Sequence, residues 1–160
     1  MPDSLLCPAA PVTDVQYMHL AMNQAQSAAL RGEVPVGALV VWDDRIIAAA
    51  GNRTITDCDP TAHAEIVALR EAAQKLGNHR LIGASVYVTV EPCAMCAGAL
   101  VQARVARLVY GADEPKGGAV RTSLRVLDAP ALNHRVEVTS GVLAEESVKL
   151  LQSFFSTRRS

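Results

Sequence analysis

The stretch 84-ASVYVTVEPCAMCAGAL-100 decides the fold of this chain. Its first half, residues 84–90, is almost entirely apolar or β-branched, which is typical of a strand covered on both faces. Residues 92–103 predict a helix, and the apolar run 105–112 predicts a second buried strand. Because a helix joins these two strands, we expect them to run parallel in one sheet.

Hydrophobic periodicity extends this pattern in both directions along the chain. Asp59 and Pro60 favour a helix start, with Asp as the cap and Pro at the first helical position. Asp14 is expected to cap an earlier helix in the same way. The other expected elements are helix 14–30, strands 36–42 and 45–52, helix 59–76, strand 134–142 and helix 144–159. This order predicts an α/β fold, a three-layer α/β/α sandwich with a mixed sheet of mostly five strands.

Length and composition predict one folded domain. Of the 160 residues, 50% are hydrophobic and 19% are charged, which is ordinary for a globular protein and excludes a disordered chain. We expect residues 1–13 to form a flexible tail and residues 14–160 a single domain. Since no apolar run is long enough for a bilayer and no secretory signal is recognisable, we expect a cytoplasmic protein with no membrane partner.

Four side chains near the central stretch are unusual for an apolar core: His63, Glu65, Cys93 and Cys96. The two cysteines lie in the first turn of one expected helix, and His63 and Glu65 lie near the start of another. Both helices follow extended segments at one end of the sheet, where open α/β folds place their sites. One imidazole and two thiolates suit Zn²⁺. Three protein ligands leave one tetrahedral position open, which indicates a catalytic rather than a structural zinc.

Glu65 lies two residues from His63, so we expect its carboxylate beside the open position rather than on the metal. There it can take a proton from a zinc-activated water and return it to a leaving group. Alternative interpretations are a satisfied core histidine, a redox CxxC pair or half of a zinc finger. A finger needs a second ligand pair close in sequence, and His19, His79 and His134 are poorly placed for one. A redox pair explains neither His63 nor Glu65.

These motifs together resemble a known family. The runs HAE (63–65) and EPCAMC (91–96) are similar to the signature of zinc-dependent nucleobase deaminases, in the cytidine/deoxycytidylate deaminase superfamily. From Val15 to Arg159 the chain resembles the bacterial tRNA-specific adenosine deaminases. The resemblance rests on EVPVGALVV, GNR, DPTAHAEIVALR, YVTVEPCAMCAGAL, ADEPKGGA, NHRVEV, GVL and LLQSFF. It implies a cytidine deaminase-like fold and hydrolytic conversion of the wobble adenosine of a tRNA anticodon to inosine.

The resemblance also implies a role for each central residue. His63, Cys93 and Cys96 would hold one Zn²⁺ per subunit. Zinc-activated water would attack C6 of adenine, while Glu65 carries a proton to N1 and later to the departing ammonia. Asn52 would hydrogen-bond the flipped base, although next to Gly51 it also fits an ordinary turn. The anticodon stem-loop would be the partner, because an unpaired base is inexpensive to extrude.

Further substrate contacts are implied outside the metal motif. Val34 and Pro35 would supply apolar wall near the base, and Lys116 would contact a tRNA phosphate, although a solvated loop lysine fits equally. Glu114 stands in the same loop where the family commonly has Asp. Residues 121–124 read Arg-Thr-Ser-Leu in place of an expected Gly-Ser-Leu-like run, which alters the RNA contacts expected of this loop.

Two alternative functions remain open. A small-molecule deaminase acting on guanine or cytosine would share the zinc motif, and a non-catalytic zinc or redox module would share the cysteines. The net charge of −1 gives no nucleic-acid signal, but residues 81–160 hold nine Lys and Arg against seven Asp and Glu. A local basic surface is sufficient for contacts to an anticodon stem. The resemblance implies a homodimer, and the small residues of 93-CAMCAGALVQAR-104 would permit close helix contact.

Overall fold

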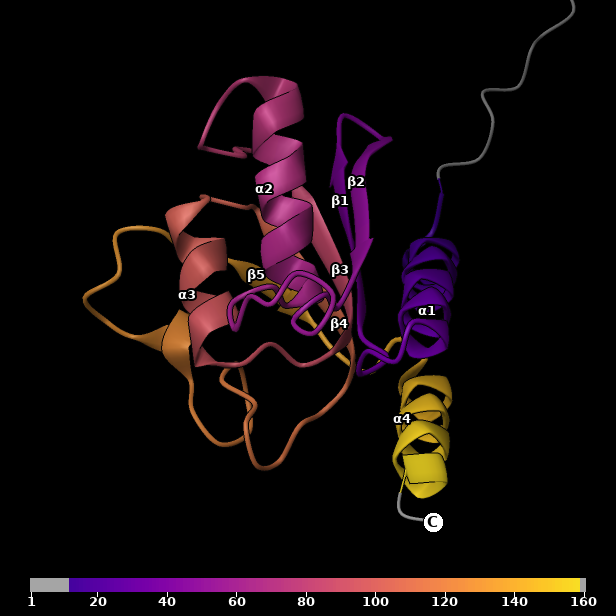
Figure 1. The fold of residues 1–160 in the computed structure, drawn as a ribbon. Coiled ribbons are helices and arrows are strands. Elements are labelled where there is room, and N and C mark those ends of the chain that lie inside the picture. Colours follow the sequence, from indigo (N-terminus) through magenta and orange to yellow (C-terminus); the bar gives the residue numbers. More distant parts are fainter. Residues whose placement is uncertain (1–11, 159–160) are drawn as a thin grey trace, which may run out of the picture.

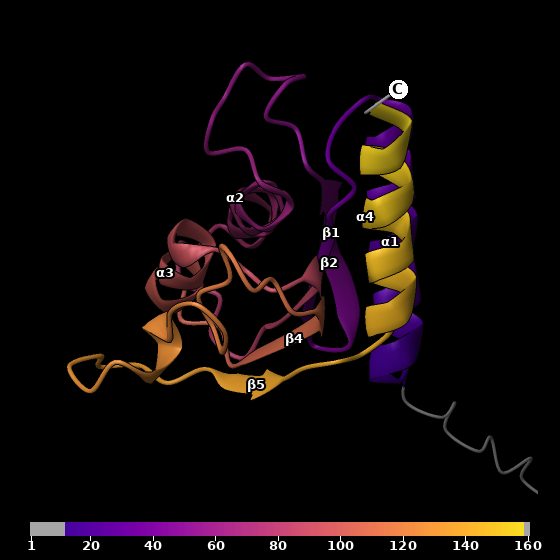
Figure 2. The ribbon, with the colours of Figure 1, turned by 90° about the horizontal axis from the view of Figure 1, so that it is seen from below.

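The computed structural model describes residues 12–158, in which a five-stranded sheet lies between two pairs of helices (Figure 1). Helices α1 and α4 cover one face of the sheet, and α2 and α3 cover the other (Figure 2). The predicted three-layer α/β/α sandwich is thereby confirmed. The elements are α1 (Asp14–Leu30), β1 (Gly37–Trp42), β2 (Arg45–Gly51), α2 (Ala64–Leu76), β3 (Ser85–Val90), α3 (Ala94–Gln102), β4 (Arg107–Ala112), the 3₁₀ helix η1 (Val126–Asp128), β5 (Glu137–Thr139) and α4 (Ala144–Arg158).

The sheet has the strand order β2-β1-β3-β4-β5. Strand β1 pairs antiparallel with β2 and with β3, whereas β3, β4 and β5 run parallel, as predicted for the two central strands. In the parallel register Val90 lies opposite Ala112, so β3 and β4 end at the same edge. The segments that begin at Glu91 and Asp113 therefore start side by side.

The central strands are buried on both faces. Val86 and Val88 point into the larger apolar cluster under α2 and α3. Tyr87 and Val109 point to the other side, where they pack with Met18 of α1. Because neighbouring residues of a strand face opposite sides, a strand between two helical layers needs apolar residues at every position. The uninterrupted apolar sequence of 84–90 has this cause.

Helix α2 begins later than predicted. The Asp59 carboxylate does not cap the helix, because it accepts hydrogen bonds from the backbone N–H and hydroxyl of Thr61, at 2.9 and 2.7 Å. This closes a separate turn, and the helix starts at Ala64 with His63 as its N-cap residue. The predicted stop is confirmed, since Gly77 ends α2 in a left-handed conformation with φ +64°.

Three other boundaries differ from expectation. Thr13, not Asp14, caps α1, in a capping box with Gln16. Helix α3 begins after Cys93 and ends at Gln102. The strand expected over 134–142 is confined to β5, Glu137–Thr139.

Apart from Val12 and Thr13, the predicted N-terminal tail lies outside the described residues, as does Arg159. Within residues 12–158, no helix combines the length and the apolar character that crossing a membrane requires.

Candidate functional site

Three donor side chains from two separate segments converge in space. The Nδ1 atom of His63 lies 3.6 Å from the sulfur of Cys93 and 3.4 Å from the sulfur of Cys96. One donor atom from each of the three residues lies within 4.8 Å of the others. This group could hold a metal ion, and it is the cluster predicted from the sequence.

Two helix N-termini position these donors. His63 and Cys93 are the N-cap residues of α2 and α3, and both have extended backbone conformations with no side-chain capping bond. Cys96 follows in the first turn of α3, on the same side as Cys93. The side chains that would otherwise cap the helices are thus free to face one another. Both N-termini carry partial positive charge, which favours thiolates over thiols.

The two thiols differ in acidity. Hydrogen bonds from Cys96 and then from His63 lower the pKa of Cys93 to about 3. The same contact with Cys93, together with burial, raises the pKa of Cys96. The Cys93 hydrogen bond also raises the pKa of His63. A thiolate, a second sulfur and an imidazole within this distance form a soft donor set suited to a divalent cation such as Zn²⁺.

Glu65 lies in the first turn of α2 and is only 4% exposed. Burial raises the pKa of its carboxyl, against the lowering effects of its own backbone amide and of Cys96. Its charged form is therefore disfavoured relative to a carboxylate in water, so the group is well suited to accept and hold a proton.

A cavity of about 310 Å³ opens onto this cluster. Val34 and Asn52, two predicted substrate contacts, lie in its wall beside His63, Glu65 and Cys93. Val36 and Val90 add an apolar surface that the sequence interpretation did not include. Pro35 is buried and does not line this cavity; its neighbours Val34 and Val36 do, because side chains alternate in extended chain.

A second cavity, of about 550 Å³, adjoins the first and shares Val34, Val36 and Val90 with it. Its outer wall comes from α4, and includes Leu151 and Phe155. Glu114 lines this second cavity instead of the one that contains the three donors. Lys116 is exposed and lines neither.

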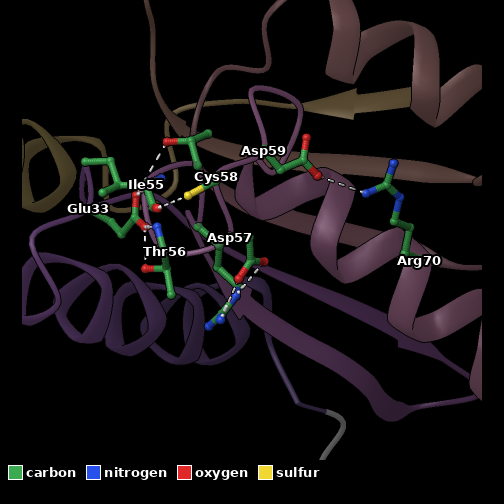
Figure 3. A network of polar contacts seen from close by, with 9 residues as sticks. Glu33, Ile55, Thr56, Asp57, Cys58, Asp59 and Arg70 are labelled. Carbon is green, nitrogen blue, oxygen red and sulfur yellow. Dashed lines mark hydrogen bonds and ion pairs between the residues drawn. The ribbon is translucent and has the colours of Figure 1, made fainter.

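The loop between β2 and α2 is held by a buried carboxylate that sequence reasoning missed (Figure 3). Glu33 is 0% exposed and accepts hydrogen bonds from the backbone N–H groups of Ile55 and Thr56, at 3.1 and 2.7 Å. The Thr56 hydroxyl adds a third bond at 2.6 Å, and the Thr54 hydroxyl lies 3.4 Å away. Through this loop Glu33 steadies the cavity wall near Asn52. The only feature of the sequence that indicates burial of this charge is that Glu33 directly precedes an apolar run.

Arg121, which departs from the expected family pattern, is used within the fold. Its guanidinium donates to the hydroxyl of Ser140 at 3.1 Å and to the carbonyl of Val138 at 3.2 Å. This side chain therefore joins its loop to the end of β5 while remaining exposed to solvent.

Comparison with known proteins places the chain in a family. A sequence profile of the MafB19-like deaminases matches residues 12–159. The chain belongs to this deaminase family. It is 50% identical over 143 residues to the tRNA-specific adenosine deaminase of Agrobacterium fabrum (strain C58 / ATCC 33970), covering 89% of this chain and 94% of that protein. It is 47% identical over 146 residues to the protein of the same name from Bacillus subtilis (strain 168), covering 91% of each.

Solved structures support the same assignment of this deaminase. One, from studies of A-to-I editing by tRNA:A34 deaminases at the wobble position of transfer RNA, has a TM-score of 0.82 and 50% identity, over 84% of this chain and 98% of that one. A guanine deaminase from Nitrosomonas europaea has a TM-score of 0.79 at 25% identity, over 91% of this chain and 86% of that one. The cytidine deaminase-like fold expected from the motifs is therefore confirmed.

Proposed function

We propose that this deaminase converts the wobble adenosine of a tRNA anticodon loop to inosine and releases ammonia. One observation carries the proposal: two of the three clustered donors, His63 and Cys93, line the same cavity as the buried carboxyl of Glu65. The function follows from this geometry in a chain that is 50% identical to a tRNA-specific adenosine deaminase over almost its whole length.

The residues present fit a zinc ion. His63, Cys93 and Cys96 would hold it, and two thiolates would balance its charge. When bound, Zn²⁺ supplies Lewis acidity, which makes water acidic enough to act as a nucleophile near neutral pH. Three protein donors match a catalytic zinc, whereas structural sites use four.

Glu65 would move the protons of the reaction. Its carboxylate accepts a proton from the attacking water and delivers it to N1 of adenine as the water oxygen bonds to C6. Glu65 then takes the remaining proton of the oxygen that has bonded to C6 and passes it to the exocyclic nitrogen. The bond between C6 and that nitrogen breaks, and the amine leaves as ammonia. Because its burial raises the pKa of the carboxyl, Glu65 can hold each proton between taking it from the oxygen and releasing it to a nitrogen.

The walls of the cavity would orient the base. Val34, Val36 and Val90 offer apolar surface to its ring, and the amide of Asn52 can hydrogen-bond its edge. The adjoining cavity would take the flanking nucleotides, with Glu114 at its rim and Lys116 outside it to meet phosphate. A single-stranded anticodon loop suits this arrangement, since extruding an unpaired base costs little.

The decisive experiment is an inosine assay on a short RNA hairpin with an ACG anticodon loop. We expect inosine at the wobble position only, with a rate that falls steeply as the salt concentration rises. A hairpin with guanosine in place of the wobble adenosine is the matched control and should yield no product. Turnover of free guanine or cytosine with no activity on the hairpin would overturn the proposal.

A small-molecule guanine deaminase is the second candidate, since the Nitrosomonas europaea enzyme shares the fold at a TM-score of 0.79. Its 25% identity is half of the 50% identity with the tRNA-specific adenosine deaminase, so tRNA is the favoured substrate. A non-catalytic redox module has less support, because it has no use for the buried carboxyl of Glu65.

Two further parts of the proposal concern assembly and location. We place a homodimer contact on α2 and α3, where Ile66, Leu69, Ala73 and Ala99 border an open apolar cavity of about 440 Å³. Sedimentation should give about twice the 17.0 kDa mass of one chain, and Ile66→Glu should reduce the measured mass to that of one chain.

We also place the protein in the cytoplasm, where thiols stay reduced and tRNA is available. A fluorescent fusion tests this location.

A further inference from the structure

Glu91 joins the metal-ligand segment to the loop that contains the proposed RNA contacts. It lies between the end of β3 and Cys93, and it is only 4% exposed. Its Oε1 accepts the backbone N–H of Glu114 at 3.0 Å, and the hydroxyl of Thr122 lies 2.9 Å from the same oxygen. Its Oε2 accepts three more backbone N–H groups, from Val120 at 3.0 Å, Arg121 at 2.9 Å and Thr122 at 3.2 Å. One carboxylate thus holds both ends of the loop 113–122.

Backbone contacts bring this loop against the same segment. The N–H of Glu91 donates to the carbonyl of Ala112 at 2.8 Å, and the N–H of Ala119 donates to the carbonyl of Pro92 at 2.8 Å. Gly118 packs so closely that a Cβ atom there would come within 2.5 Å of the Glu91 carboxylate. The loop therefore fits around this particular side chain.

Hydrogen bonds within the loop connect its backbone to the proposed substrate contacts Glu114 and Lys116. The carboxylate of Glu114 accepts the backbone N–H groups of Lys116, at 3.0 Å, and Gly117, at 3.4 Å. The Thr122 hydroxyl lies 2.8 Å from the carbonyl of Glu114. Moving the Glu114 backbone would therefore move Lys116 as well. Glu91 itself lines the cavity that holds the donors, while Glu114 lines the adjoining one.

We propose that Glu91 is a positioning residue for substrate recognition: its carboxylate sets how far Glu114 and Lys116 stand from the catalytic cavity. The inference rests on the proposed tRNA function. Glu91 acts through the loop and not on the reacting atoms, because both of its oxygens are occupied by loop donors. Its removal should affect substrate binding more than the chemical step.

The substitution Glu91→Gln separates these effects. Three N–H groups converge on Oε2, so the amide oxygen of Gln is favoured there and its NH₂ takes the place of Oε1. Two donors then face each other, and the bond to the Glu114 N–H is lost. The end of the loop that includes Glu114 is released, while the end near Val120 remains held.

The test is steady-state kinetics on the ACG hairpin, with zinc content and thermal midpoint measured on the same samples. Glu91→Gln should raise KM about tenfold, leave kcat within about threefold and retain one zinc per chain. Thr122→Val, which removes only the hydroxyl contacts, should raise KM by about three- to fivefold. Thr122→Ser keeps the hydroxyl, so its KM should lie close to that of the parent protein.

Three results would overturn the inference: an unchanged KM in Glu91→Gln, losses of kcat and zinc that account for all lost activity, or equal KM values for Thr122→Val and Thr122→Ser. If Glu91→Gln yields no folded protein, the Thr122 pair decides alone. Failure of the proposed function is distinguishable, because the parent protein itself would then form no inosine in the hairpin.

Discussion

Glu65 and Glu91 are both buried carboxyls beside the same cavity, yet their surroundings give them different tasks. Glu91 is surrounded by N–H donors of one loop, which stabilise its negative charge. Burial dominates at Glu65 and raises the pKa of its carboxyl. A residue that carries protons needs such an environment, whereas one that anchors a loop needs fixed donors.

Replacing Glu65 with Gln removes the proton carrier and preserves its shape. We expect the rate of inosine formation to fall by about 10²- to 10⁴-fold, the usual contribution of general acid–base catalysis. Zinc content should stay at one per chain, and the thermal midpoint should not fall, because a buried carboxyl with a raised pKa does not stabilise the fold in its charged form. The assays are single-turnover deamination, metal analysis and calorimetry.

Glu71→Gln is the matched control on the same helix. Glu71 is partly exposed and pairs with Lys75 on the surface. The Glu71→Gln variant should therefore form inosine at the rate of the parent protein. Equal rates for Glu65→Gln and the parent would contradict the role assigned to Glu65.

At the scale of the elements, α1 lies unusually close to β1. A Cβ atom on Gly37 would collide with the backbone carbonyl of Ala21 and would lie 2.6 Å from the backbone nitrogen of Ala25. Backbone atoms of a packed helix cannot move aside singly, so the whole contact between α1 and the sheet depends on this glycine.

Gly37→Ala should therefore destabilise the protein by about 2 to 4 kcal/mol, near the upper range for overpacked cores. The control is Gly98→Ala within α3, where a Cβ atom meets nothing within 4 Å. It should stabilise the protein by about 0.5 to 1 kcal/mol through helix propensity. Urea unfolding at two protein concentrations measures both changes and separates any effect of association. A destabilisation of the same size in both variants would contradict this account.

An ion pair ties the first turn of α1 to strand β4. Arg107 of β4 donates to both carboxylate oxygens of Asp14, at 2.7 and 2.6 Å, and the hydroxyl of Tyr87 donates to the same carboxylate at 2.8 Å. The Arg107 hydrogen bonds hold the pKa of Asp14 below its usual range, against the opposing effect of burial. Charged Asp14 therefore stabilises the folded state.

Asp14→Asn should cost about 1 to 3 kcal/mol at pH 7, the usual value of hydrogen bonds to a charged group. Because the pKa of Asp14 is lower in the folded state, its contribution is complete above the unfolded value of about 3.9 and is lost as the pH falls through the folded value. The stability difference between parent and variant should thus be constant from pH 7 to 5 and shrink toward pH 3. Urea unfolding across this range measures it. Asp128→Asn, in an exposed pair with Arg125, should show little change at any pH.

At the scale of the whole molecule, the three donors bring together the starts of two helices that lie about thirty residues apart along the chain. His63 begins α2 and Cys93 begins α3, and the loops on either side of the cavity are anchored separately by Glu33 and Glu91. A cation that binds the folded state and not the unfolded state adds its binding free energy to the stability of the fold.

Metal removal should reveal this link. After chelation we expect the thermal midpoint to fall by several degrees and deamination to stop, and added Zn²⁺ should restore both. Cys93→Ser should behave like the chelated protein, while Cys58→Ser should not, since Cys58 is exposed and lies away from the three donors. Scanning calorimetry with metal analysis tests this. Full activity in protein shown to be metal-free would refute it.

Much of this architecture was predictable because its causes are local. The apolar run 84–90 indicates a strand between two layers, and Gly77 marks the end of α2, since both patterns act over a few residues. The start of α2 at Ala64 is not predictable in this way, because Asp59 and Pro60 have every local property of a helix start. The Asp59 carboxylate instead bonds Thr61, which local propensity does not reveal.

The amino-acid sequence by itself determined the chemistry of this protein: the spacing of His63, Cys93 and Cys96 specifies a soft metal site, because ligand type and helix position are properties of short segments. Only the tertiary structure decided that Val36 and Val90 share the cavity with Asn52, and that Glu33 and Glu91 hold the loops beside it. The physical reason is that a buried carboxylate must find its hydrogen-bond donors wherever the fold brings them, here more than twenty residues away along the chain.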